Sequence, residues 1–536
     1  MASVANAQAI AASTPKLIVF VSVDQFSSDL FQQYRSRFTG GLRRLLDGAV
    51  FPAGYQSHAA TETCPGHSTL MTGDRPARTG IIANEWYDFR GARPGIVYCA
   101  EDEARGTYKD YVAADTHLRV PTLGERLKAA DAAVRTVSIA GKDRAAIMMG
   151  GHRVDQLWFW RDGKGFISYA GRTPPVAVTA ANKAAADAIA RPGDAYAEPD
   201  WCRSIDAPVA VGSRTVGSGR FQRAAKAEAL WKASPAFDAS VVDLAVGMVR
   251  DMRLGHGKSI DVLTVGASAT DYVGHTFGTE GSEMCIQMAN LDRTLGRLVG
   301  ALDATGVDYV LALSADHGGN DIPERERQRG MPMADRVAAT LSPKTVGEQI
   351  AARVGWTGGQ LLFGGTNGDI WVAPAATGTL RADVIAAAVA RYRADPQVGA
   401  VFTAAEVAAT PMPAGAPEAW TLLERARASY DPARSGDLLV FLKPRITAIP
   451  PNYPGSVATH GSPWDYDRRV PILFWRKGTR GFEQPLSIET VDIMPTLAAL
   501  AGLRLAPGEV DGRCIDLDGG PGDTCLADGN HRGEAE

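Results

Sequence analysis

The sequence predicts an α/β fold built on a mostly parallel sheet. Continuous apolar, β-branched runs are typical of strands that are buried on both faces, and they lie at residues 17–23, 134–140, 261–265 and 309–314. An amphipathic helical stripe at residues 284–302 separates the last two runs. Polar residues follow the runs, at the place where such sheets bind their ligands.

Length and composition leave the domain count open. The 536 residues suffice for one large domain with insertions or for two or three domains. With 45% hydrophobic and 22% charged residues, the chain can bury a sizeable core. The formal net charge of −4 and the lack of basic runs argue against nucleic acid as a dedicated partner. No apolar run approaches the length of a membrane span.

The N-terminal residues 1–13 are small and Ala-rich. They lack the basic start and the long apolar centre of a secretory signal, but they resemble its small-residue end. We therefore expect an exported protein, periplasmic or extracellular, whose signal has been trimmed. An unstructured N-terminus is the alternative.

The six cysteines include no C-x-x-C pair, so a thiolate zinc site is not expected. Cys514 and Cys525 flank a short Gly/Asp-rich loop and can form a disulfide in an oxidising compartment. Cys64 is expected to be a small buried neighbour of the site rather than a catalyst.

Taken in order, the first half of the chain supplies four polar positions next to ordered elements. The strand at 17–23 ends at Asp24, and a helix is expected near 42–46. An apolar run at 80–83 ends at Asn84. The strand at 134–140 delivers Lys142 and Arg144, which share a face if this segment is extended. A hairpin follows at 157–169, inside a weakly periodic stretch, 146–235, that we interpret as an insertion covering the site.

The second half repeats this arrangement. The strand at 261–265 leads to Asp271 and His275, and the strand at 309–314 leads to Asp316 and His317. His460 precedes an apolar strand at 470–475. The remaining expectations are a second insertion at 320–435 with a helix near 382–392, a strand at 437–442, a last helix at 490–500 and a Gly/Asp-rich surface tail at 503–536.

The stretch from Thr61 to Ser68 is interpreted as a nucleophile turn. An extended run ends there, Thr63 lies at the corner, and Pro65 opens a helix. Free N–H groups at a helix start, including that of Cys64, are expected to point at an anion. A plain turn is the alternative for this motif taken alone.

Carboxylates and imidazoles converge if these strands share a sheet. Oxygen and nitrogen ligands without thiolate suit catalytic Zn²⁺, whereas Mg²⁺ or Mn²⁺ prefers more oxygen. The candidate ligands are sufficient for two metals, with Thr63 on one of them: Asp24, Asp271, His275, Asp316, His317 and His460. Taken singly, each of these residues has a structural alternative: a helix cap, a turn, an exposed helix pair or a loop histidine. His67, inside the nucleophile motif, is expected to support the ligands rather than bind metal.

These motifs, in this order, resemble the alkaline phosphatase superfamily, and within it secreted bacterial alkaline phosphatases with a threonine nucleophile. The resemblance rests on Val23-Asp24, Thr61 to His67, Gly80 to Asn84, Lys142-Asp-Arg144, Asp271 to His275, Asp316-His317-Gly and Thr459-His460-Gly. It implies a three-layer α/β/α sandwich over residues 15–502, with the two insertions covering the active site.

The resemblance also implies two zinc ions. Asp24, Asp316 and His317 would hold one, with Thr63 on it as an alkoxide, and Asp271, His275 and His460 would hold the other. Thr63 would attack phosphorus and become phosphothreonine, which water on the second zinc would hydrolyse.

Lys142, Arg144 and Asn84 bear on the substrate class. A monoester dianion offers oxygen charge that a diester lacks, which Arg can bind as a fork and Lys as a point charge. In the resembling family such a Lys-x-Arg accompanies monoesterase activity, and the Asn contacts the phosphoryl group. The expected substrates are therefore small phosphate monoesters. A solvated surface pair is the alternative for Lys142 and Arg144.

Other activities remain as alternatives. A phosphodiesterase or nucleotide pyrophosphatase would use the same metals and Thr63, and an inactive zinc-binding protein would keep the ligands without turnover. A sulfatase is disfavoured because its motif needs x-Pro-x-Arg after the nucleophile, and a metal-independent phosphomutase because the ligand set is complete. The physiological ester and the oligomeric state stay open, as does Ca²⁺ binding by Asp516, Asp518 and Asp523, for which a solvated turn is the alternative.

Overall fold

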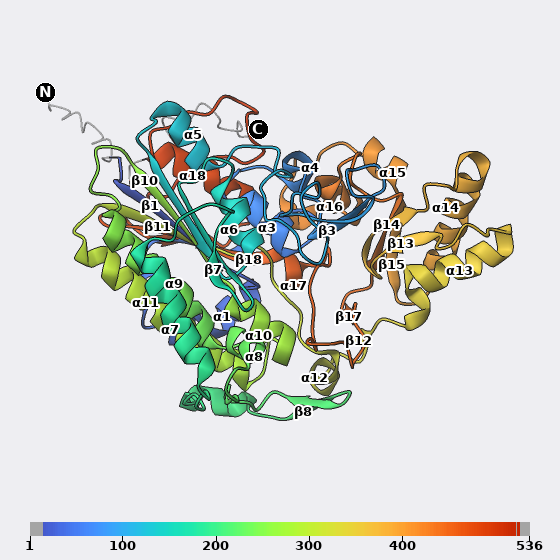
Figure 1. Cartoon of the computed structure of the whole chain (residues 1–536), viewed down its shortest axis with the longest axis horizontal. Coiled ribbons are helices and arrows are strands. Elements are labelled where there is room, and N and C mark those ends of the chain that lie inside the picture. Colours follow the sequence, from blue (N-terminus) through green and yellow to red (C-terminus); the bar gives the residue numbers. More distant parts are fainter. Residues whose placement is uncertain (1–13, 521–522, 526–536) are drawn as a thin grey trace, which may run out of the picture.

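The computed structural model describes residues 14–520 and 523–525, so the predicted remnant of a signal at 1–13 lies outside the described residues. Its centre is a nine-stranded sheet with the order β19-β2-β18-β11-β1-β10-β5-β6-β7 (Figure 1). Five neighbouring strands are parallel: β11 (Tyr309–Ser314), β1 (Leu17–Val23), β10 (Asp261–Ala267), β5 (Arg135–Ala140) and β6 (Gln156–Arg161). The mostly parallel sheet predicted from the apolar runs is therefore confirmed.

The remaining strands of this sheet close its two sides. β18 (Arg469–Arg476) pairs antiparallel with β11 and is followed outward by β2 (Ala49–Tyr55) and β19 (Phe482–Glu483). On the other side β7 (Gly165–Ile167) forms the expected hairpin with β6. The start of an antiparallel strand lies at the same edge as the ends of its parallel neighbours. The loop before β18 therefore reaches the edge where β11 ends.

Helices cover both faces of the sheet. Along β1, Leu17, Val19 and Val21 join one apolar core, whereas Ile18 and Phe20 join the other. The first face carries α1 (Ser28–Tyr34), α2 (Gly41–Leu45), α7 (Val176–Ala190), α9 (Pro235–Met252), α10 (Ala269–Phe277) and α11 (Ser282–Ala304). The opposite face carries α3 (Thr63–Leu70), α5 (Leu123–Ala130), α6 (Asp143–Gly150) and α18 (Ile493–Leu500). This is the three-layer sandwich that the resemblance implied (Figure 1).

Residues 335–447 add a lobe with its own apolar core, on the right of Figure 1. Its four-stranded sheet has the order β13-β14-β16-β15, from β13 (Leu362–Gly364), β14 (Gly368–Val372), β15 (Val398–Thr403) and β16 (Leu438–Leu442). The helices α13 (Pro343–Val354) and α14 (Gly378–Arg393) pack on it, and α15 (Ala404–Ala409) and α16 (Leu422–Ser429) follow. A small cluster of Ala59, Val407, Ala426, Leu439 and Phe441 attaches the lobe beside α3.

Residues 146–235, interpreted above as an insertion, fall into two parts: an early part that belongs to the central fold and a later part with a sheet of its own. β6 and β7 belong to the central sheet, and α7 packs on α9. The later part holds a separate hairpin, β8 (Val209–Val211) and β9 (Arg214–Val216). The proposed boundaries of both insertions stay a prediction.

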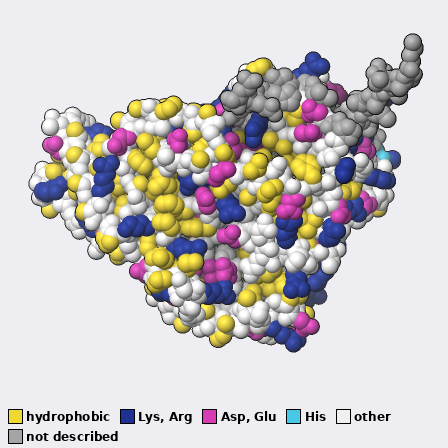
Figure 2. All heavy atoms as spheres, turned by 180° about the vertical axis from the view of Figure 1, so that it is seen from behind, with side chains coloured by type: hydrophobic (Ala, Val, Ile, Leu, Met, Phe, Trp, Pro, Cys, Tyr) yellow, Lys and Arg dark blue, Asp and Glu magenta, His cyan; other side chains and the backbone are white. Residues whose placement is uncertain are grey.

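Three disulfides pair all six cysteines: Cys64–Cys99, Cys202–Cys285 and the expected Cys514–Cys525. The described part of the C-terminal tail is more than a surface loop, because Leu505, Val510 and Leu517 are buried against the second core. Among the described residues, the helices are too short or too polar to cross a membrane. On the face shown in Figure 2, cationic and anionic side chains are interspersed.

Candidate active site

The predicted ligands meet at one edge of the central sheet. Asp24 follows β1, Asp316 and His317 follow β11, and α10 carries Asp271 and His275 directly after β10. Because β11, β1 and β10 are parallel neighbours, their carboxyl ends lie side by side. His460 arrives from the loop before β18, at the same edge.

The ligand atoms form two groups, in which the members of each lie within 4.8 Å of one another. One group is Asp24, Asp316 and His317, and the other is Asp271, His275 and His460. The rings of His317 and His460 stack at 3.6 Å between centroids, so the two groups adjoin. This is the same division into two sites that the resemblance implied.

Several of these atoms are buried without making a hydrogen bond among the described residues. They are Oδ1 of Asp24, Oδ1 of Asp271, Oδ2 of Asp316 and Nε2 of His317, whereas the second oxygen of Asp24 is ion-paired with Lys142. The other oxygen of Asp316 accepts the backbone N–H groups of Gln25 and His317, at 3.2 and 3.0 Å. Buried polar atoms are normally satisfied. Such atoms, present in both groups, therefore fit coordinated cations.

The three histidines are oriented in the same way. In each ring Nδ1–H donates to a backbone carbonyl, which fixes the tautomer and leaves the Nε2 lone pair for a ligand bond. The bonds run from His275 to Ala458, from His317 to Gly318 and from His460 to Thr61, at 2.9, 2.8 and 2.8 Å. Burial lowers the pKa of His317 to about 3, so this ring is neutral, as a metal ligand must be.

Negative charge exceeds positive charge at this edge. Burial and the neighbouring Asp316 raise the pKa of Asp24 well above its usual range. Burial also opposes ionisation of Asp271, but His275 and Lys142 outweigh it and hold the pKa of that carboxyl well below its usual range. Lys142 pairs with two of these three buried carboxylates, Asp24 and Asp271, and the ion-pair partners of Asp316 are histidines, so the site can take further positive charge. Two divalent cations would supply it.

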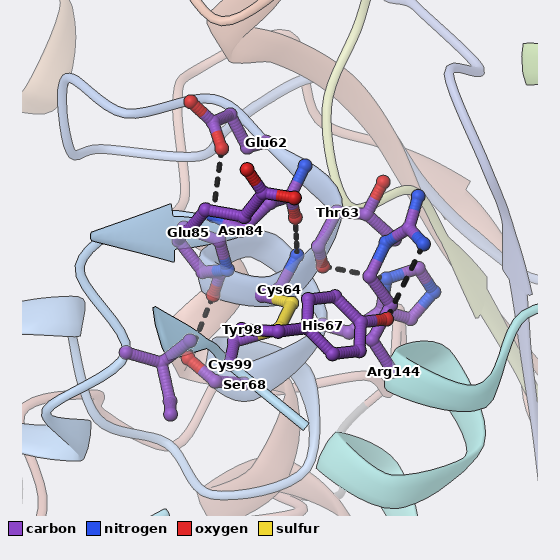
Figure 3. Close-up of a disulfide and its surroundings, with 12 residues drawn as sticks. Glu62, Thr63, Cys64, His67, Ser68, Asn84, Glu85, Tyr98, Cys99 and Arg144 are labelled. Atoms are coloured by element: carbon purple, nitrogen blue, oxygen red, sulfur yellow. Dashed lines mark hydrogen bonds between the residues drawn. A yellow bond between two sulfur atoms is a disulfide. The ribbon is translucent and has the colours of Figure 1, made fainter. Parts of the chain in front are cut away.

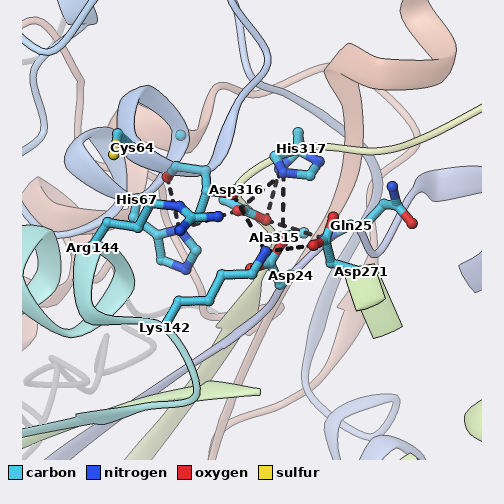
Figure 4. A network of polar contacts seen from close by, with 12 residues as sticks. Asp24, Gln25, Cys64, His67, Lys142, Arg144, Asp271, Ala315, Asp316 and His317 are labelled. Carbon is cyan, nitrogen blue, oxygen red and sulfur yellow. Dashed lines mark hydrogen bonds and ion pairs between the residues drawn. The ribbon is translucent and has the colours of Figure 1, made fainter. Parts of the chain in front are cut away.

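Lys142 reaches one carboxylate of each group, Asp24 and Asp271 (Figure 4). Its Nζ is 2.7 Å from Asp24 Oδ2 and 2.5 Å from Asp271 Oδ2, and these two carboxylates raise its pKa against the effect of burial. The same Nζ is 3.5 Å from Thr63 Oγ1. The segment is not extended as predicted: Lys142 is the N-cap of α6, and Arg144 lies in the first turn of that helix. The two side chains nevertheless reach the same site.

Thr63 begins α3, two residues before the predicted start of the helix at Pro65. The helix comes so close to the end of β11 that a Cβ on Gly66 would lie 2.0 Å from the carbonyl oxygen of Asp316. Only glycine permits this approach, which sets Thr63 beside the two groups of candidate ligands. His67, the predicted supporting residue, lies 3.1 Å from Asp316 Oδ2 and 2.9 Å from the carbonyl of Thr63 through Nδ1.

The backbone N–H of Cys64 does not point at an anion as predicted. It donates to Asn84 Oδ1 at 2.8 Å. Asn84 lines the cleft, and its oxygen is engaged, so its amide nitrogen is the end that can donate to a ligand. The Cys64 amide is therefore engaged within the protein, and Asn84 supplies a side-chain donor at the cleft.

Arg144 has partners that the sequence analysis missed. Its Nη1 is 3.5 Å from the hydroxyl of Tyr98, which donates to Asp143 Oδ1 at 2.7 Å, and Tyr111 also binds Asp143. Arg144 Nε is buried and makes no hydrogen bond among the described residues. No local signal marks Tyr98 or Tyr111, because their relation to Asp143 depends on the path of a distant hairpin.

A cleft of about 560 Å³ opens above Thr63. The central domain contributes Glu62, Asn84, Arg144, His275 and His460. The lobe contributes residues 364–365 and 367–369, together with Trp371, Leu439 and Phe441. The lobe thus forms one wall of the cleft. Three carboxylates, those of Glu62, Glu85 and Asp369, also line it.

Similarity to known proteins agrees with this geometry. Residues 18–463 match the family described as Type I phosphodiesterase / nucleotide pyrophosphatase. The chain is 54% identical over 525 residues to Alkaline phosphatase PhoK of Sphingomonas sp, which covers 97% of this chain and 94% of that protein. It is 49% identical over 522 residues to Alkaline phosphatase PhoD of Zymomonas mobilis, covering 96% and 90%. The crystal structure of alkaline phosphatase PafA shares the fold, with a TM-score of 0.82 at 24% identity over 94% of this chain and 99% of that chain.

Proposed function

Since the chain belongs to the Type I phosphodiesterase / nucleotide pyrophosphatase family of the alkaline phosphatase superfamily and is an enzyme of the alkaline phosphatase class, we propose that it is a zinc-dependent phosphomonoesterase. It hydrolyses small phosphate monoesters to inorganic phosphate through a phosphothreonine intermediate on Thr63. The observation that carries this proposal is the position of Thr63 Oγ1, 3.5 Å from Lys142 Nζ and beside two groups of ligand atoms.

The donor sets favour two Zn²⁺ ions. One site offers two carboxylates and one imidazole, and the other offers one carboxylate and two imidazoles. Three protein ligands leave open positions, as in catalytic zinc sites. When bound, such metals lower the pKa of a coordinated hydroxyl or water and stabilise charge on the leaving oxygen. Asp24, Asp316 and His317, together with Thr63, form one proposed site, and Asp271, His275 and His460 form the other.

The protein groups then divide the work of the reaction. Thr63 Oγ1 forms the new bond to phosphorus while the bond to the ester oxygen breaks, and the alcohol departs with a proton. Water then displaces Thr63 and releases phosphate. Lys142 Nζ and Arg144 contact the non-bridging oxygens, and Asn84 donates its amide N–H to the same phosphoryl group.

Monoester preference follows from those cations. The dianion of a monoester carries one more negative charge than a diester, and Lys142 lies within reach of it. The buried Nε of Arg144 is a donor without a hydrogen bond among the described residues, as expected of a group that binds an incoming oxygen. A phosphodiesterase is the second candidate, favoured by the description of the family matched. An inactive zinc-binding protein fits less well, because nucleophile and ligands are all in place.

Further features support export. All six cysteines are paired, which is typical of an oxidising compartment such as the periplasm or the cell exterior. We also propose that the fold acts as one catalytic domain, residues 15–502, and that the second insertion restricts access to the site. Calcium binding in the tail remains a weaker proposal.

Replacement of Thr63 tests the proposal. Thr63→Ala is expected to lower kcat by about three orders of magnitude or more while zinc content and melting temperature stay near those of the wild type. Thr63→Ser is the matched control, because it keeps the hydroxyl and should retain measurable turnover. Acid quenching during turnover should trap phosphate on Thr63, detected by mass spectrometry. Wild-type turnover by Thr63→Ala would reject the nucleophile.

A further inference from the structure

The geometry points to a positioning role for the Cys64–Cys99 disulfide: it holds Asn84 and Arg144 in register with Thr63. This inference rests on the proposed function of those three residues. Both cysteines are fully buried, and the bridge joins α3 to the end of a hairpin made by β3 (Glu85–Asp88) and β4 (Gly95–Tyr98) (Figure 3).

Asn84 is held between the two halves of the bridge. The N–H of Cys64 donates to its side-chain oxygen at 2.8 Å, and the N–H of Cys99 donates to its carbonyl at 2.9 Å. The backbone N–H of Asn84 in turn donates to Glu62 Oε2 at 2.7 Å. Two of the three hydrogen bonds of Asn84 therefore come from the disulfide-linked residues themselves. Moving either cysteine would turn the amide that faces the phosphoryl group.

The same bridge also bears on Arg144. Tyr98 directly precedes Cys99, and its hydroxyl lies between Asp143 Oδ1, at 2.7 Å, and Arg144 Nη1, at 3.5 Å. Asp143 accepts the backbone N–H of Arg144 at 2.7 Å. The hairpin end thus positions both the first turn of α6 and the guanidinium.

The hairpin needs such an anchor. β3 and β4 pair only with each other and form a two-stranded sheet separate from the central one. A two-stranded hairpin is marginally stable by itself. Packing of Trp86, Tyr87 and Phe89 against His117, Trp371 and Phe363 holds the length of the hairpin, and the bridge ties the end that carries Asn84 and Tyr98 to α3. A shift of about 1 Å in such groups can cost about 100-fold in rate.

The test compares two disulfides in the zinc-loaded enzyme. The Cys64→Ala/Cys99→Ala variant is expected to lose about 10- to 100-fold in kcat/KM for p-nitrophenyl phosphate. The matched control is Cys202→Ala/Cys285→Ala, which opens a bridge spanning 83 residues instead of 35. The longer loop makes the control at least as costly for stability. It should nevertheless keep wild-type kcat/KM at temperatures where both variants are folded.

A double-mutant cycle shows whether the bridge acts through Asn84. In an Asn84→Ala background, removing Cys64 and Cys99 is expected to cost clearly less than in the wild type, because one of the two groups that they position is gone and only the effect through Arg144 remains. An undiminished loss in that background, or an equal loss in the control variant, would overturn the inference.

A milder variant keeps the test open if the double alanine variant does not fold. Tyr98→Phe removes only the hydroxyl beside Arg144, and its expected loss of about fivefold should vanish in an Arg144→Ala background. If the loss persists in that background, Tyr98 does not act through Arg144.

Thr63→Ala, assayed alongside, separates the two proposals. If it is inactive while the bridge variant is fully active, only the positioning role fails. If it turns over normally, the proposed function fails and the inference falls with it.

Discussion

Removing the two cations at the start of α6 should change which esters the enzyme prefers. We expect the Lys142→Ala/Arg144→Ala variant to lose far more activity on phosphate monoesters than on diesters. Lys142 Nζ is 3.5 Å from Thr63 Oγ1, so the oxygens of a phosphoryl group bonded there come within its reach. Arg144 lines the same cleft.

The magnitude follows from the charge on those oxygens. Two hydrogen bonds to a charged group contribute about 1.5–3 kcal/mol each, or ~3–6 kcal/mol together. That corresponds to a loss of about 10²- to 10⁴-fold in kcat/KM for the monoester dianion. A diester lacks the second negative charge, so its loss should be about tenfold or less. The ratio of the two rate constants should therefore fall by at least an order of magnitude.

The assay uses p-nitrophenyl phosphate and bis-p-nitrophenyl phosphate on the zinc-loaded enzyme at mildly alkaline pH. Because Lys142 also pairs with Asp24 and Asp271, zinc content is measured for every variant. Lys128→Ala is the matched control: Lys128 is also a buried, ion-paired lysine, but its partner is Asp155 rather than a site residue. Equal losses on both esters at full zinc loading would refute the dianion reasoning and favour the phosphodiesterase reading.

Three further outcomes are expected. Removing the metal with a chelator should abolish activity and lower the melting temperature by several degrees, because three carboxylates then lack their counter-ions. Added Zn²⁺ should restore both, and an unchanged melting temperature would contradict this expectation. Gly66→Ala should destabilise the fold by about 3 kcal/mol or more in denaturant titrations, since its Cβ would meet the carbonyl of Asp316 at 2.0 Å, whereas Gly300→Ala, with open space around it, should not. Asp369, whose pKa burial raises to about 7, is charged only above that pH. At pH 9 the ionised Asp369 carboxylate should repel a substrate with an anionic leaving group, such as ADP. Asp369→Asn should therefore raise kcat/KM for ADP relative to p-nitrophenyl phosphate at that pH, and an unchanged ratio would exclude this repulsion.

The strand ends could be predicted because their signals are local. The apolar runs at 17–23 and 309–314 coincide with β1 and β11, and the residues that follow them, Asp24 and Asp316, lie at the sheet edge as expected. Burial on both faces requires an uninterrupted apolar segment, and the first polar residue after it marks the exit from the core. The sequence alone therefore predicts a site residue when a single local segment determines both the strand and the point where it ends.

The misplaced features depend on partners that are distant in sequence. The amide of Cys64 is engaged by Asn84, a contact across a separation of 20 residues that no pattern announces. Lys142 begins a helix rather than extending a strand, and the Asp143 carboxylate that binds the first turn is itself held by tyrosines from the hairpin region. The pairing of Cys64 with Cys99 has the same origin. Each requires the fold before it can be seen.

The difference between residues held by the sheet and residues held by distant partners affects how substrate preference can change within the family. The groups proposed to bind metal follow β1 and β11, lie on the helix after β10, or precede β18. The central sheet therefore fixes their relative positions. The groups proposed to read the phosphate charge, Asn84 and Arg144, stand instead on a loop and on a helix start braced by a disulfide-linked hairpin. Such segments can change without disturbing the sheet. A change from monoester to diester activity would therefore require different residues at the hairpin and the start of α6, while the ligands and Thr63 remained in place.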